Sequence, residues 1–238
     1  HGVVCGGKDL FGAFMSFETL DTCGRLEIDA AKLGKPRLLT DEEIEIDASI
    51  GSPRLDEFIP NTVSSEERAA RRDLCTIIHR AYDQKLFTST QGTFSMRLSD
   101  GSFLITPYNQ DRKYLEPEDI VRIKGGMCEM GKNPSRATRL HEEIYRTHPD
   151  INSIISAHPP AIMAFAVTDA EFDSRTIPES YITLRNVKRL PYAFSRTNIA
   201  ETAAVFDAKT PVAIVNNQCV IVTGNSLLNA YDRLEVLE

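Results

Sequence analysis

The sequence predicts an α/β protein built on a layered mixed sheet, and three observations carry that prediction. Ser99-Asp100-Gly101 and Gly125-Gly126 each separate two short apolar runs, which is the pattern of a β-hairpin. Residues 151–157 form an apolar run of the kind that a fully buried strand shows. Helical patterns lie between these strands, so hairpins alternate with helices, and a purely parallel βαβ arrangement is disfavoured.

The first quarter of the chain contains a strand, a helix and a linker in this prediction. Residues 1–7 are apolar and punctuated by glycine, which predicts a buried strand. Asp9 is a candidate N-cap for a helix that Gly34 ends. Residues 39–65 are acidic, contain two prolines and have weak periodicity, so we expect an irregular linker there.

From Ser65 onward the elements are sharper. Helical spacing of apolar residues predicts helices over residues 65–84, 140–147, 161–167, 198–208 and 227–237. Short apolar runs predict strands over residues 94–98, 103–106, 121–124, 128–130, 151–157, 187–190, 212–215 and 220–222.

Composition excludes several classes of protein. The chain has 27 Lys and Arg residues against 34 Asp and Glu residues, a formal net charge of −7, so we expect no nucleic-acid partner and no anionic membrane surface. No apolar run approaches the roughly 20 residues that span a bilayer. The five cysteines are an odd number and never form a Cys-x-x-Cys pair, which indicates free thiols and a cytoplasmic location.

The two ends of the chain resemble each other. Residues 1–21 overlay residues 218–238 without a gap, and both copies have the pattern strand, glycine turn, helix. The identical pairs are Val3 with Val220, Gly7 with Gly224, Leu10 with Leu227, Ala13 with Ala230, Glu18 with Glu235 and Leu20 with Leu237.

This overlay predicts an internal duplication. We expect residues 1–38 to be the last strand and helix of a preceding unit, residues 39–65 to be a linker, and residues 66–238 to be a second, nearly whole unit.

Several ordered motifs over residues 66–238 carry a family resemblance. They are Gly92-Thr93-Phe94-Ser95, Thr106-Pro107, Pro134-Ser135 followed by His141 and Tyr145, Ile154-Ile155 followed by His158-Pro159-Pro160, and the closing stretch 217–224. Together they resemble the class II aldolase/adducin family, and in particular L-fuculose-phosphate aldolases. The resemblance implies a three-layer α/β/α fold with a central mixed, mainly antiparallel sheet.

The resemblance also implies a chemistry. Active members hold a zinc ion with three histidines, two in a His-x-His after the buried strand and one in an Asn-His-Gly before the last strand. The metal stabilises an enediolate while a nearby Glu moves a proton, and a carbon–carbon bond in a small phosphorylated sugar is broken or made.

Residues 66–238 depart from that pattern at nearly every chemical position. Ser156 replaces the first histidine, Gln218 replaces the third, and Ala137 replaces the Glu, so His158 is the one ligand left. The two phosphate loops are changed as well, to Gly92-Thr93 and Tyr108-Asn109. We therefore expect a catalytically inactive domain without its own metal.

Some residues remain candidates for binding. Arg136 can fill the space beside the missing Glu and metal and bind an anion, with Ser156, Gln218, Thr93 and Ser95 as further candidates. The alternative for Arg136 is a solvated loop residue. His158 is either a hydrogen-bonded structural residue or a vestigial ligand, and His141 on its helix is expected to be a packing or surface residue.

His1 aligns with Gln218, so it takes the third-ligand position of the preceding unit. Zinc or another divalent metal is expected in that unit alone, although His1 as an ordinary terminal residue is the alternative.

Three functions fit these observations. The first is a lyase component, in which this unit has a structural or site-completing role beside an active aldolase-like repeat or subunit in a homo-oligomer. The second is an adducin-like interaction module without enzymatic activity. The third is a metal-free pocket for a small anion.

Overall fold

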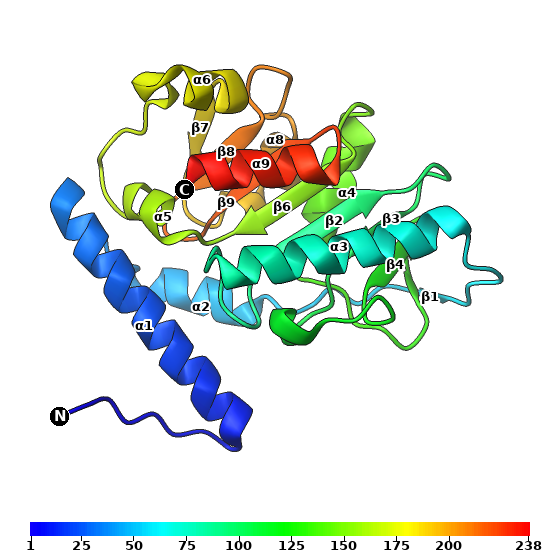
Figure 1. Ribbon diagram of the computed structural model, residues 1–238, viewed down its shortest axis with the longest axis horizontal. Coiled ribbons are helices and arrows are strands. Elements are labelled where there is room, and N and C mark those ends of the chain that lie inside the picture. Colours follow the sequence, from blue (N-terminus) through cyan, green and yellow to red (C-terminus); the bar gives the residue numbers. More distant parts are fainter.

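A nine-stranded mixed sheet is the centre of the computed structural model, which describes residues 1–238 (Figure 1). The strands follow the order β1-β5-β4-β3-β2-β6-β9-β8-β7, and only the pairs β1–β5 and β7–β8 are parallel. The strands are β1 (Glu57–Phe58), β2 (Thr93–Arg97), β3 (Phe103–Ile105), β4 (Val121–Lys124), β5 (Met127–Glu129), β6 (Ser153–Ala157), β7 (Val187–Leu190), β8 (Val212–Val215) and β9 (Cys219–Gly224).

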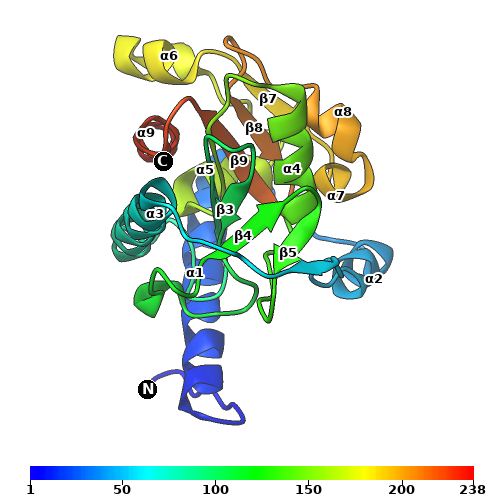
Figure 2. The same ribbon diagram turned by 90° about the vertical axis from the view of Figure 1, so that its right-hand side faces the viewer.

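Helices lie on both sides of this sheet, as Figure 2 shows. One side carries α3 (Ser65–Asp83), α5 (Pro160–Ala166), α6 (Pro178–Leu184) and α9 (Leu227–Leu237). The other side carries α2 (Asp41–Ser49), α4 (Thr138–Thr147), α7 (Phe194–Thr197) and α8 (Ile199–Ala203). The long α1 (Leu10–Leu33) packs against α5, and its N-terminal part extends away from the sheet. None of these helices has the length and apolar character needed to cross a membrane.

The alternation of side chains along the central strands makes two separate cores. In β6, Ile155 faces the core under α3 and α9, whereas its neighbour Ile154 faces the core under α4 and α8. In β9, Val220 and Val222 join the first core and Ile221 joins the second. Period-2 alternation with both faces buried produces three layers, and the predicted α/β/α fold with a mainly antiparallel sheet is confirmed.

Most predicted elements are confirmed to within a few residues. Asp9 caps α1 by accepting a hydrogen bond from the Gly12 amide, and Gly34 ends that helix. The helix predicted over residues 198–208 is wrong in extent: α8 ends at Ala203, and Phe206 is buried beyond it.

Two predictions in the first quarter of the chain are wrong. Residues 1–7 form no strand here and are largely exposed, because no sheet edge lies beside them to bond their amides and carbonyls. The predicted irregular linker 39–65 contains α2 and β1, which pairs with β5. Thr40 begins α2 with a capping box, since its hydroxyl accepts from the Glu43 amide while the Glu43 carboxylate accepts from the Thr40 amide.

A buried ion network ties α3 to the edge of the sheet. The Glu67 carboxylate is fully buried and accepts hydrogen bonds from Arg71 at 2.6 Å and from Arg122 of β4 at 2.8 Å. Arg71 also pairs with Glu129 of β5, and Arg122 with Asp100. Each buried charge therefore has an opposite charge and hydrogen bonds beside it, which is the condition for burying it.

Candidate functional site

A cavity of about 760 Å³ opens on the α4 side of the sheet, where β2, β6 and β9 meet. Its wall includes nine of the positions singled out in the sequence: Gly92, Thr93, Tyr108, Asn109, Arg136, Ala137, Ser156, His158 and Gln218. Strand register explains this convergence, because Thr93 of β2 lies opposite Ser156 of β6, and Ala157 lies opposite Val220 of β9. His158 and Gln218 therefore flank the same end of the β6–β9 pair.

The residues at the expected metal position do not fit zinc. A hydroxyl, an imidazole and an amide stand there, at Ser156, His158 and Gln218, and the chain contains no group of three or more His, Cys, Asp or Glu side chains that could hold a metal ion. The Gln218 amide oxygen instead accepts a hydrogen bond from the Ala193 amide at 3.1 Å. A single imidazole falls short of the three protein ligands of a catalytic zinc site, so no chemistry through a metal follows from this cavity.

Behind the cavity wall lies a chain of buried hydrogen bonds. Ser156 Oγ lies 3.2 Å from Nε2 of His141, whose Nδ1 lies 2.8 Å from Ser95 Oγ. Ser95 Oγ in turn lies 2.7 Å from the hydroxyl of Tyr145. Burial lowers the pKa of His141 to about 3, so its ring is neutral at ordinary pH.

This network corrects one binding candidate and reveals an overlooked residue. Ser95 is fully buried and does not line the cavity, so it orients His141 and cannot touch a ligand in this conformation. His141, expected to be a packing or surface residue, is the group that fixes the Ser156 hydroxyl at the wall. The sequence offered one signal for this role: His141 follows Ala137 by four residues, so the two lie on the same face at the start of α4.

His158 lines the cavity, and part of its ring lacks a hydrogen-bond partner. Its Nδ1 atom is buried without a hydrogen bond. Burial, and next the positive charge of Arg136, lower the pKa of His158 to about 4, against a backbone hydrogen bond with Gln218 that raises it. The ring is therefore neutral at pH 7, and one of its nitrogens is buried without a partner.

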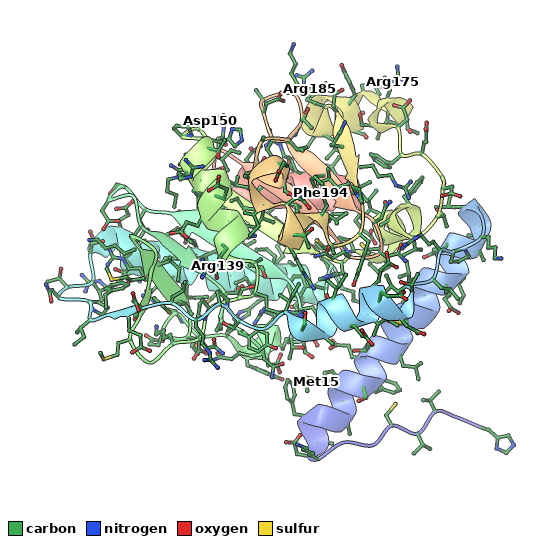
Figure 3. The ribbon with its side chains drawn as sticks, turned by 180° about the vertical axis from the view of Figure 1, so that it is seen from behind. Met15, Arg139, Asp150, Arg175, Arg185 and Phe194 are labelled. Carbon is green, nitrogen blue, oxygen red and sulfur yellow. The ribbon has the colours of Figure 1, made fainter.

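Four arginines make the cavity strongly positive. They are Arg112, Arg136, Arg139 and Arg196, and Figure 3 labels Arg139 at the start of α4. Arg112 is almost completely buried and donates to the carbonyls of Gly92 and Gln110. Burial lowers its pKa to about 10, which still leaves it charged at pH 7. The sequence singled out Arg136 but gave no signal for Arg112 or Arg196, which long-range packing brings to the wall.

The first phosphate-loop position keeps its glycine for a structural reason. Gly92 has a φ of +77°, and a Cβ there would lie 2.8 Å from the Phe87 ring, so no other residue fits. The Thr93 hydroxyl that follows is bonded to the Ser135 hydroxyl at 2.6 Å.

His1 lies outside this site. It is exposed, and the N-terminus lies at the far end of the segment that precedes α1 (Figure 1). The structure therefore brings nine predicted site positions together and leaves Ser95 behind the wall and His1 remote.

Comparison with known proteins agrees with the geometry. The family described as "Class II Aldolase and Adducin N-terminal domain" matches residues 72–238. An L-fuculose phosphate aldolase of Methanococcus vannielii is 30% identical over 169 residues, which cover 70% of this chain and 91% of that protein. A 3-oxo-tetronate 4-phosphate decarboxylase of Pectobacterium atrosepticum is 26% identical, covering 74% of this chain and 84% of its own.

Solved structures show the same fold. The L-fuculose-1-phosphate aldolase of Thermus thermophilus superposes with a TM-score of 0.60 at 25% identity, covering 71% of this chain and 91% of that one. YgbL of Escherichia coli, a putative aldolase, epimerase or decarboxylase in its description, gives a TM-score of 0.61 at 24% identity, covering 71% of this chain and 84% of its own.

Proposed function

Because the chain belongs to the class II aldolase and adducin family, we propose that residues 66–238 form a catalytically inactive member that binds a small anionic, sugar-like ligand. In this proposal the domain has a site-completing or structural role beside an active lyase unit that handles small phosphorylated sugars or aldehydes. A homo-oligomeric state and a cytoplasmic location remain predictions of the same reading.

One observation carries the loss of catalysis. The positions of two metal ligands and of the acid/base Glu hold Ser156, Gln218 and Ala137, and both polar replacements are hydrogen-bonded within the protein. An alanine has no proton to transfer, and a hydroxyl and an amide are poor zinc ligands beside one histidine.

The positive cavity supports ligand binding. Four guanidinium groups and a neutral His158 line a space of about 760 Å³, a volume suited to a small molecule. Guanidinium groups pair with carboxylates and phosphates through charge-assisted hydrogen bonds, which fits the phosphorylated substrates named for the relatives.

Arg136 is the first test of this proposal. Arg136→Ala should weaken binding of glycerol 3-phosphate by about tenfold or more, because a charge-assisted contact is lost. Isothermal titration calorimetry measures the affinity, and Arg175→Ala, at an exposed arginine paired with Asp173, is the matched control. Equal affinity in wild type and Arg136→Ala would contradict the proposal.

Metal analysis tests the other half. The purified chain equilibrated with zinc should retain none at stoichiometric level after gel filtration. One zinc per chain that disappears in His158→Ala would show that the cavity still holds a metal, and the inactive assignment would be wrong.

We propose further that residues 1–38 end a preceding aldolase-like unit. The same close approach of glycine to helix occurs at both ends of the chain. A Cβ on Gly7 would meet the Ala13 amide nitrogen at 2.3 Å, and a Cβ on Gly224 would meet the Ala230 amide nitrogen at 2.5 Å. The N-caps repeat as well, since Asp9 accepts from the amide three residues on, as Ser226 does.

The exposed side of α1 supports the same proposal. Leu10, Phe14, Phe17 and Leu20 are 43–87% exposed, whereas the matching α9 residues Leu227, Tyr231, Leu234 and Leu237 are at most 6% exposed. The apolar residues of α9 pack on the sheet, whereas the matching residues of α1 have no sheet beside them. We infer that the sheet of the preceding aldolase-like unit covers these α1 residues.

Hydrogen exchange tests this placement. The amides of residues 3–7 should exchange rapidly in the chain of residues 1–238. They should become protected in a protein that also carries the preceding unit, because a strand inside a sheet forms hydrogen bonds on both edges. Unchanged exchange would favour the second candidate function, an adducin-like interaction module, for which the exposed apolar side of α1 is also a suitable surface.

A further inference from the structure

Helix α2 lies against the mouth of the cavity. Leu39, Ile44, Asp47 and Ile50, from this helix and its flanks, form part of the cavity wall. Figure 3 shows α2 on the side of the molecule that also carries α4 and α7. We call residues 37–52, which comprise α2 and the residues bonded to the domain at its two ends, the strap.

Asp47 of the strap is held by two arginines of the cavity. Its Oδ1 forms an ion pair with Nη1 of Arg196, and its Oδ2 lies 3.7 Å from Nη1 of Arg136. The two carboxylate oxygens therefore face two different guanidinium groups, as the oxygens of a bound carboxylate or phosphate would.

The charge balance of the cavity depends on this one residue. Its wall contains four arginines, and Asp47 is the only carboxylate in it. Without the strap the cavity would hold four positive groups and no negative one, which is an unfavourable state that a small anion relieves.

The strap buries little apolar surface and is held mainly by polar contacts. No residue of α2 is buried, and Ile44 and Ile46 are 52% and 40% exposed. Its ends are tethered by hydrogen bonds, from Arg37 to Asn217 on one side and from Ser52 to Asn133 on the other. Between them, the Tyr192 hydroxyl donates to the Glu43 carbonyl. Little apolar burial would be lost if α2 moved away.

We propose that Asp47 occupies the oxyanion site of the cavity, and that a small carboxylate or phosphate ligand binds between Arg136 and Arg196 by displacing Asp47 and releasing α2. This inference rests on the proposed anion-binding function and adds the position of the anion and the regulation of access to it. The site uses the place of the missing metal and Glu, at the start of α4 beside His158.

His158 narrows the class of ligand. His158 lines the same cavity as the two arginines, and its Nδ1 atom is buried without a hydrogen-bond partner. A hydroxyl both donates and accepts, so a ligand hydroxyl that reaches the His158 ring can pair with it in either tautomer. The structure therefore favours an oxyanion that also carries a hydroxyl, such as a hydroxy acid or a polyol phosphate.

Removing the charge of Asp47 tests the inference. Asp47→Asn should raise the affinity for glycerol 3-phosphate, glycerate and inorganic phosphate by about tenfold or more in calorimetric titrations, because the internal competitor is gone. Glu45→Gln removes a charge from an exposed position of the same helix and should leave the affinity unchanged. Hydrogen exchange of residues 41–49 should rise on adding ligand to wild type.

The outcomes separate this inference from the proposed function. Arg136-dependent binding in wild type with no gain in Asp47→Asn would overturn the role of Asp47 and leave anion binding intact. No binding to any variant would overturn both. Binding by Asp47→Asn that Arg196→Gln abolishes would support the inference, and a preference for glycerate or for glycerol 3-phosphate would identify the anionic group.

Discussion

At the scale of single residues, the side chains at the two positions where metal ligands were expected have hydrogen-bond partners within the protein. Ser156 bonds to His141, and Gln218 accepts from the Ala193 amide. A buried polar group without a partner costs about 1–3 kcal/mol, so the bond to His141 stabilises the buried Ser156 in the cavity wall. Restoring one histidine alone at Ser156 or Gln218 would break such a bond without completing a metal site.

His141 gives this network a pH dependence. Its pKa is about 3 in the folded protein and near 6.5 when unfolded, so only the unfolded state gains a proton as pH falls below 6.5. The free energy of unfolding should therefore fall by about 2 kcal/mol from this group between pH 7 and pH 5. Urea denaturation at both values measures it, and His141→Gln should show a smaller drop. An equal drop in the variant would mean that other groups cause the dependence.

At the scale of elements, α1 and α9 begin alike and end in different surroundings. Matched truncations should separate them. Leu234→Ala should lower the free energy of unfolding by about 2–5 kcal/mol, because it leaves a cavity under α9. Phe17→Ala, at the matching and 51% exposed position of α1, should change it by less than about 0.5 kcal/mol. Chemical denaturation measures both, and a large loss in Phe17→Ala would show that the side of α1 that carries Phe17 is packed in this chain.

The elements also show where sequence reasoning succeeds. α3, α9 and both hairpins were predictable because caps, turns and periodicity are local signals. The same local signal was present for α2, since Thr40-Asp41-Glu42-Glu43 has the capping-box spacing, but the acidic, proline-containing surroundings obscured it. Residues 1–7 failed for another reason: a strand requires partners, and partner strands are not a property of the segment itself.

The site divides along the same line. Sequence motifs identified several of the residues that line the cavity, among them Thr93, Arg136, Ser156, His158 and Gln218. The fold then brings these motif positions together. Asp47 and Arg196 come from segments that the motifs do not cover, and only tertiary packing brings them to the cavity.

At the scale of the whole molecule, the network around Glu67 joins α3 to β4 and β5. Glu67→Gln should lower the free energy of unfolding by about 3–5 kcal/mol, because Arg71 and Arg122 would lose a buried counter-charge. Glu143→Gln, which breaks a surface pair with the exposed Arg146, should cost less than about 0.5 kcal/mol. Thermal and urea denaturation compare the two, and similar costs would contradict a special role for the buried network.

The strap's two tethers set the terms on which any outside ligand competes. Arg37 and Ser52 anchor the two ends of the strap by hydrogen bonds. After its ion pairs with the cavity arginines break, Asp47 therefore remains near them at an effective concentration on the order of millimolar or higher. Dilution of the protein does not change that local concentration. A free oxyanion with the same intrinsic affinity for the two arginines must reach a comparable concentration to displace Asp47. Only an abundant or a more tightly binding oxyanion would therefore occupy the site.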